Sequence, residues 1–269
     1  MSQLLRPYPQ YAGVTVINSP TVYSIYHSIQ VKAEKRMSHG QSFLLSFTGG
    51  KLISNGNNSL AGLGVQNNGT SVQNWYNLNG ERAISEQDQS KSLAISYVAE
   101  LPFGKNHTLA PTGIPAAILG GWNLSGLFSY GGGLPLVITA PISGGGNRPN
   151  STGQSATLPG GRSHSAEIQQ WFNTSVFTLP PSYSYGNVSR TLPDTRGPSI
   201  TNLNVSLVRN IRVYEHVDLQ VRGEAFNLTN TPHFWLPVTA MSSLQFGQIT
   251  ASQVAQLPRV LQFAMKLVF

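Results

Sequence analysis

Residues 259–269 read RVLQFAMKLVF, and this stretch decides the fold. Every second residue in it is large and apolar: Leu261, Phe263, Met265, Leu267 and Phe269. Because successive side chains of a β-strand point to opposite faces, the stretch predicts a strand with one apolar face and one mixed face. Soluble sheets usually protect an exposed edge with charges or prolines, whereas this strand runs to a terminal aromatic residue. The pattern favours the closing strand of a membrane β-barrel.

The composition favours the same class of fold. Charged residues make up 10% of the chain and hydrophobic residues 40%. An ordinary soluble domain carries about 25% charged residues. No stretch approaches the ~20 consecutive apolar residues of a transmembrane helix. Apolar residues are instead distributed over alternating segments, which is typical of strands that meet lipid on one face and water on the other.

The charge and the cysteine count exclude other classes of protein. The chain has no cysteine, which rules out a disulfide framework or a thiolate metal site. The net charge is +7, but the 17 Lys and Arg residues are scattered singly along the chain. Because nucleic-acid binding needs a continuous basic surface, we expect no nucleic-acid partner.

Six earlier segments alternate in the same way as the last one. Residues 1–22 hold three prolines and show no period, so they are expected to form a loop that enters the barrel. The remainder, residues 23–269, is expected to be all-β and antiparallel. The predicted strands lie at residues 23–36, 41–51, 90–101, 122–139, 200–210, 217–227 and 259–269.

The connections alternate in length. Those after the second, fourth and sixth strands run to roughly thirty residues or more, as in outer-membrane barrels with long extracellular loops and short periplasmic turns. The last strand would then end in the periplasm of a Gram-negative cell. Single-chain bacterial barrels have even strand numbers, so seven strands predict a segment of a larger barrel. The first ten residues also lack the apolar core of a signal peptide.

Several motifs resemble one family of receptors. Residues 202–207 read NLNVSL, residues 219–230 read LQVRGEAFNLTN, and PHF follows at 232–234. Together with GGW at 120–122 and WFN at 171–173, they resemble the C-terminal barrel region of TonB-dependent outer-membrane receptors of the Oar-like group. Those receptors carry an N-terminal carboxypeptidase-regulatory-like domain.

The resemblance implies a function and a set of partners. It implies a barrel of about 22 strands, of which the chain would supply roughly the last third. The function would be energy-coupled solute uptake, with the chain supplying barrel wall and ligand-facing loops. No plug or TonB box is recognisable, so the chain alone is expected not to transport. The expected partners are outer-membrane lipid, the barrel-assembly machinery, the rest of the receptor and, through it, the TonB energy coupler. Similarity to outer-membrane proteins in general makes Phe269, with its apolar partners at 261–267, the expected assembly signal.

Two groups of residues are candidate sites. Asp218, Arg222 and Glu224 share one face of a predicted strand, which makes them a candidate lumen-facing network. Arg148, Trp171 and Phe172 lie in the second long loop and are candidate ligand contacts, although packing is the favoured role of the two aromatic residues. The six histidines are dispersed without a zinc-ligand spacing, so no metal or cofactor is expected.

Alternative functions remain open at this point. An outer-membrane adhesin or surface scaffold would use the same barrel and long loops without transport. A soluble β-sandwich that binds a ligand is a further alternative. No grouping of Ser, His and Asp or of Cys and His stands in a recognisable context, so we expect no enzyme.

Overall fold

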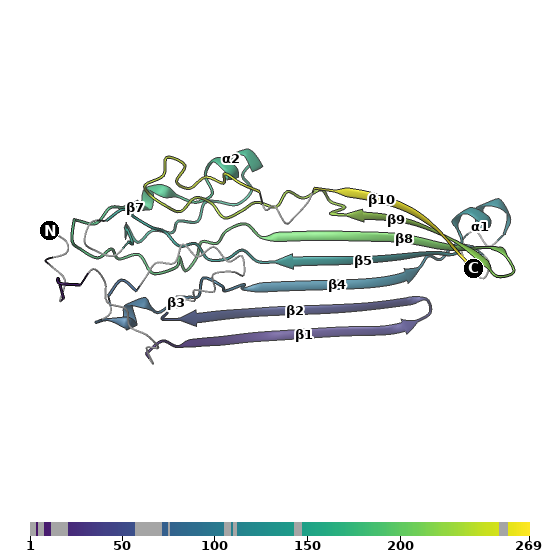
Figure 1. Cartoon of the computed structure of the whole chain (residues 1–269), viewed down its shortest axis with the longest axis horizontal. Helices are drawn as coiled ribbons and strands as arrows, with labels where there is room; N and C mark the ends of the chain where they lie inside the picture. Colours follow the sequence, from purple (N-terminus) through teal and green to yellow (C-terminus); the bar gives the residue numbers. More distant parts are fainter. Residues whose placement is uncertain are drawn as a thin grey trace.

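Seven long strands form one antiparallel sheet in the computed structural model of the chain (Figure 1). The structure describes residues 4, 8–11, 21–56, 72–74, 76–104, 109, 112–142, 147–252 and 258–269. The loop predicted at residues 1–22 lies mostly outside this set. The strands follow one another in the order β1 (Ser24–Ser38), β2 (Gln41–Ser54), β4 (Lys91–Glu100), β5 (Trp122–Gly131), β8 (Ile200–Tyr214), β9 (Val217–Phe226) and β10 (Val260–Val268).

The seven predicted strands are therefore confirmed in number and order. The sheet is open, because β1 and β10 form its two edges and do not pair with each other. Strand β8 runs four residues further than expected, to Tyr214. Among the described residues, no helix combines the length and the apolar character needed to cross a bilayer.

The register gives the sheet two different faces. Residues that pair directly across neighbouring strands share a face. One row of such partners is Ala33, Leu45, Ile95, Phe128 and Leu203. The row beside it, on the opposite face, is Lys32, Ser46, Ala94, Ser129 and Asn202. One face is therefore apolar and the other mainly polar, as the alternation of the sequence predicts.

Within the part of the chain that the structure describes, no second layer packs over the apolar face. On β10, Phe263 is 82% exposed and Met265 is 77% exposed. The buried hydrophobic cluster lies elsewhere, in the connections between strands, and consists of Leu136, Ile138, Ala156, Phe172, Val176, Phe177, Val188 and Leu192. A soluble sheet would bury its apolar face against a second layer. This sheet presents that face to its surroundings, as a membrane barrel does to lipid.

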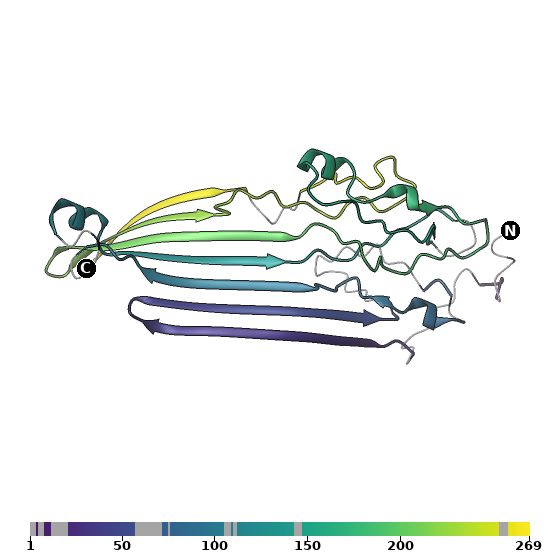
Figure 2. The same cartoon turned by 180° about the vertical axis from the view of Figure 1, so that it is seen from behind.

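The three long connections all leave the sheet at one end and fold together (Figures 1 and 2). The described residues within the ranges 55–90, 132–199 and 227–259 make up these connections, and we call them the loop cap. Backbone hydrogen bonds join the second connection to the third, including Trp171 N to Gly247 O at 2.7 Å and Thr139 N to Thr239 O at 3.1 Å. The C-terminus and the shorter connections lie at the opposite end.

Short elements that the sequence did not predict give the connections their shape. In the loop cap, β3 pairs with β2, and β6 pairs with β7 in a separate small sheet. One helix, α1, lies instead between β4 and β5 at the other end of the sheet. The bounds are η2 (Leu78–Glu81), β3 (Ala83–Ile84), α1 (Gly113–Leu119), β6 (Asn150–Ser151), α2 (His164–Gln169), η3 (Thr174–Val176) and β7 (Phe177–Thr178).

The strand predicted at residues 122–139 is too long. Strand β5 ends at Gly131, and the chain then enters the loop cap, where Leu136 and Ile138 are buried. The backbone at Gly133 passes so close to the next segment that a Cβ atom there would lie 1.8 Å from the carbonyl oxygen of Gly197. Gly197 N also donates to Leu134 O at 2.8 Å. This close backbone contact replaces the sheet pairing that was expected beyond Gly131.

We expect Gly133→Ala to destabilise the loop cap by about 1–3 kcal/mol, because the added methyl group forces the two backbones apart. The measurement is the midpoint of thermal unfolding in detergent. Gly160→Ala is the matched control, since a Cβ at Gly160 meets no atom within 4 Å. Equal midpoints for the two variants would contradict the close approach at Gly133.

Candidate functional site: the loop cap and its pocket

A cluster of ion pairs, buried except for the partly exposed Arg196, joins two of the long connections. Arg148 pairs with Glu81, and both side chains are 2% exposed. Arg190 Nη1 lies 3.6 Å from Glu86 Oε1, and Arg196 Nη2 lies 2.5 Å from Asp88 Oδ2. The acids come from residues 81–88, before β4, and the arginines from the connection between β5 and β8. We call this set the buried ion-pair cluster: Glu81, Glu86, Asp88, Arg148, Arg190 and Arg196.

The cluster also satisfies backbone groups at the sheet end. Arg190 Nη2 donates to Ser54 O at 2.8 Å, and Asp88 Oδ1 accepts from Leu52 N at 2.5 Å. Ser54 O and Leu52 N both belong to the last three residues of β2. Charged side chains therefore fix the loop cap to the sheet, which gives the cap a defined position above the strand ends.

The position of Arg148 corrects its expected role. As a candidate ligand contact it needed an accessible guanidinium, but the structure buries this group against Glu81. Because a buried charge without a partner is costly, separating Arg148 from Glu81 inside the loop cap would lower its stability. Arg148 therefore organises the loop cap and does not face a ligand.

Burial changes the proton affinity of two members of the cluster. Desolvation raises the pKa of Glu86, and the nearby Arg190 and Arg148 oppose this shift. Desolvation also lowers the pKa of Arg190, with Glu86 acting in the opposite direction. The charged forms of both groups are thus less favourable in the folded loop cap than in the unfolded chain.

We expect the free energy of unfolding of Glu86→Gln, relative to that of the wild type, to rise as the pH is raised above about 4.5. The folded pKa of Glu86 lies above its usual value of 4.5, so the folded state holds the Glu86 proton more tightly than the unfolded state does. Ionisation of the Glu86 carboxylate therefore lowers the stability of the wild type as the pH rises, and the amide of the variant, which does not ionise, lacks this loss. Below about pH 4.5 the difference between the variant and the wild type no longer changes with pH, because Glu86 is then protonated in both states.

The measurement is thermal unfolding in detergent across a pH series, for the wild type and the variant. Glu215→Gln is the control, because Glu215 is exposed in the turn between β8 and β9. A difference between the variant and the wild type that falls as the pH rises above about 4.5 would contradict the expectation.

Aromatic packing forms the centre of the loop cap. Phe172 is fully buried, and its ring meets Phe246 at 5.3 Å and Phe177 at 6.1 Å in edge-to-face contacts. Trp171 is partly buried and donates from Nε1 to Arg196 O at 2.8 Å. The packing role favoured for Trp171 and Phe172 is therefore confirmed. The expectation of ligand contact from Phe172 is corrected, because none of its surface is accessible.

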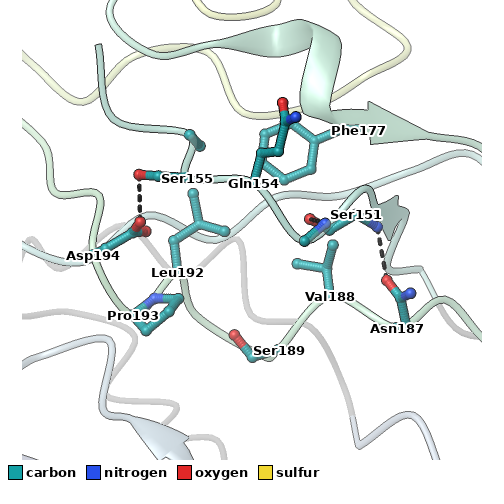
Figure 3. A pocket seen from close by; sticks show the side chains of 12 residues that line it. Ser151, Gln154, Ser155, Phe177, Asn187, Val188, Ser189, Leu192, Pro193 and Asp194 are labelled. Carbon is teal, nitrogen blue, oxygen red and sulfur yellow. Dashed lines mark hydrogen bonds between the residues drawn. The ribbon is translucent and has the colours of Figure 1, made fainter. Parts of the chain in front are cut away.

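A pocket of about 410 Å³ opens beside this core (Figure 3). Its floor is apolar and is formed by three residues of the buried hydrophobic cluster, Phe177, Val188 and Leu192. Its rim is polar and includes three side chains whose hydrogen bonds Figure 3 shows: Ser155 bonds with Asp194, and Asn187 bonds with the backbone of Ser151. The distances are 2.5 Å from Ser155 Oγ to Asp194 Oδ2 and 2.7 Å from Ser151 N to Asn187 Oδ1.

The chemistry of this pocket suits a small polar solute. Hydroxyl, amide and carboxylate groups around an apolar floor can orient a ligand by hydrogen bonds while excluding water beneath it. Sequence reasoning missed these residues, because Ser155 and Asp194 lie 39 positions apart and neither belongs to a recognisable motif. Only the folding of the loop cap brings them together.

The candidate lumen-facing residues share the polar face of the sheet. Asp218, Arg222 and Glu224 are at alternate positions of β9, as predicted, but they form two separate pairs. Asp218 Oδ1 accepts from Arg212 Nε at 2.7 Å, whereas Arg222 Nη1 lies 3.7 Å from Glu224 Oε1. Arg222 also donates to Gln220 at 3.2 Å. Their proposed lumen position stays a prediction.

The terminal residues lie as the sequence predicts. Leu261, Phe263, Met265 and Leu267 pair with Ala225, Gly223, Val221 and Leu219 of β9, so they share the apolar face of the sheet. Phe269 follows the last residue of β10 and is 98% exposed. Their recognition by the barrel-assembly machinery stays a prediction.

Comparison with known proteins identifies the family. A family model described as an outer membrane beta barrel domain matches residues 1–262. No curated protein and no solved structure matches the chain. The matched region includes almost the whole two-faced sheet and all of the loop cap, and that sheet has the alternation that outer-membrane strands require. The chain therefore belongs to the outer membrane β-barrel domain family.

Proposed function

We propose that the chain supplies part of the wall and the ligand-facing loops of a TonB-dependent outer-membrane transporter. The main support for this proposal is that the three long connections fold into one loop cap, with a pocket, at a single end of the sheet. Outer-membrane barrels place long loops outside the cell and short turns in the periplasm. The loop cap would thus face the exterior, and Phe269 the periplasm. The resemblance of residues 219–230 to Oar-like receptors supports the transporter assignment.

Each part of the chain has a role in this proposal. The pocket lined by Ser155, Asn187 and Asp194 holds a solute at the outer end of the barrel. The polar face of the sheet lines the path inward, where uncharged Ser, Thr and Asn side chains allow the solute to leave. In the complete receptor, a plug is displaced by the energy coupler of the inner membrane.

The test of transport is an in-frame deletion of the gene in its native bacterium. We expect the deletion strain to stop depleting at least one solute from a defined medium, to the same extent as a strain without the energy coupler. Re-expression of the gene should restore depletion, and a protonophore should abolish it again. Unchanged depletion of every solute would contradict transport.

The adhesin or scaffold alternative uses the same observations without uptake. In that case the deletion would leave solute depletion intact and would reduce attachment of cells to a surface or to each other. The two functions are separated by the same pair of strains, because only a transporter ties the phenotype to the energy coupler.

The orientation has its own test. An epitope inserted after Gly160 should be detected by antibody on intact cells, because Gly160 is exposed and unhindered in the loop cap. An epitope in the β8–β9 turn, after Glu215, should be detected only after the outer membrane is opened. The reverse pattern would contradict the proposed orientation.

A further inference from the structure

The helix α1 is an apolar element whose large side chains are exposed among the described residues. Its sequence is Gly-Ile-Pro-Ala-Ala-Ile-Leu, and none of its residues is buried. Ile114 is 76% exposed, Ile118 is 59% exposed and Leu119 is 45% exposed. A helix that is apolar on all sides is found in a protein core or in a membrane, because water would make it unstable. The contacts that α1 makes with the sheet indicate whether it lies in a protein core or in a membrane.

Two side chains of the sheet hold the C-terminal end of α1. Trp122 Nε1 donates to Ile118 O at 3.0 Å, and Arg209 Nη1 donates to the same oxygen at 2.8 Å. Arg209 also donates to Ala117 O. The last carbonyl groups of a helix have no partner within it, and a positive charge at this end is favourable. Arg209 and Trp122 therefore fix where α1 lies.

These two residues belong to the apolar face of the sheet. Trp122 and Arg209 are direct cross-strand partners, one step along the same face from the partners Leu124 and Leu207. The guanidinium carbon of Arg209 lies 5.9 Å from the centre of the Trp122 ring, a cation–π contact. Trp122 is the first residue of β5, so it and its partner Arg209 lie at the end of the sheet opposite the loop cap, where α1 is drawn in Figure 1. The helix is thus held on the lipid side of that rim.

We propose that α1 lies in the headgroup region of the phospholipid leaflet beside this rim and anchors the sheet there. Ile114, Ile118 and Leu119 enter the upper part of the acyl chains, while Trp122 and Arg209 stand at the level of the headgroups. Tryptophan is enriched at that depth because its ring is apolar and its N–H is polar, and arginine pairs there with phosphate. The inference goes beyond transport and depends only on the membrane position of the apolar face.

The test uses the absence of cysteine from the chain. The full chain carrying Ile118→Cys is labelled with an environment-sensitive fluorophore and reconstituted into phosphatidylcholine vesicles. We expect a blue-shifted emission and a loss of intensity in vesicles whose acyl chains are brominated near the headgroup. Labels at Leu45→Cys, on the apolar face, and at Ser96→Cys, on the polar face, provide the quenched and the unquenched reference.

The outcomes separate the anchor from the barrel. If Leu45→Cys is quenched and Ile118→Cys behaves like Ser96→Cys, the anchor is refuted while the membrane sheet stands. If the label at Ile118→Cys is shielded from bromine and from aqueous iodide alike, another protein surface covers α1, and the proposal also fails. Ile114→Cys gives a second position on the helix, so that a folding defect of one variant does not decide the result.

Discussion

Phe128→Arg is expected to remove most of the membrane-inserted protein, whereas Leu127→Arg, one position earlier, is expected to leave its amount nearly unchanged. Both residues are large and apolar and lie in the middle of β5. Phe128 stands between Ile95 and Leu203 on the apolar face. An arginine on the lipid-facing side of a barrel strand costs about 2–4 kcal/mol near the bilayer centre. That is enough to shift a marginally stable protein to the unfolded state.

Leu127 provides the matched control, because it stands between Ser96 and Asn204 on the polar face. An arginine there keeps its hydration and has polar neighbours. The measurement is the amount of heat-modifiable, folded protein in outer-membrane fractions at equal expression. Similar losses of folded protein for the two variants would mean that neither face of β5 contacts water, which would contradict a sheet with one apolar and one polar face.

Glu81→Ala is expected to destabilise the loop cap by about 3–5 kcal/mol, since it leaves a buried charge without its partner. Arg148 has 2% of its side chain exposed and cannot reach water without opening the cap. Glu81 also accepts a hydrogen bond from Gln73 N at 3.0 Å, which the substitution removes as well. The measurement is hydrogen exchange of cap amides, which reports the free energy of local opening.

Two controls separate charge burial from loss of contact. The double variant Glu81→Leu with Arg148→Met should recover much of the loss, because replacing both partners of a buried pair by apolar groups is often neutral. Glu34→Ala removes an exposed carboxylate that lies 3.0 Å from Lys32 Nζ, and it should cost less than about 1 kcal/mol. Faster exchange throughout the sheet in Glu81→Ala would contradict a defect confined to the cap.

The sheet was predictable from the sequence because the alternation of apolar and polar residues that specifies each strand lies within that strand. In β2, Phe43, Leu45 and Phe47 alternate with Ser42 and Ser46, and this alternation alone assigns each side chain to a face. The two-residue turn at His39 and Gly40, both with positive φ, joins β1 to β2, and glycine is a residue type that such turns favour. Such signals extend over a few residues and do not depend on distant segments.

The loop cap was not predictable, because its contacts join residues that are far apart in the chain. Glu81 and Arg148 are 67 positions apart, and Asp88 and Arg196 are 108 apart. In the sequence each of these charges resembles an ordinary solvated loop residue. The end of β5 was misplaced for the same reason, since only the approach of Gly197 to Gly133 takes the chain out of the sheet. The pocket shares this dependence on distant partners.

The connectivity of the sheet also determines the order of events during folding. Each long strand pairs with the next one in the sequence, so pairing proceeds between neighbours. The contacts of the loop cap join distant residues instead. Arg190 donates hydrogen bonds to Ser54, 136 positions away in the chain, and to Glu81, 109 positions away. Joining such distant segments carries a larger loop-closure entropy cost, which falls if the strands between them have already assembled. The cap therefore closes last, and only a chain whose strands have found their register can complete it.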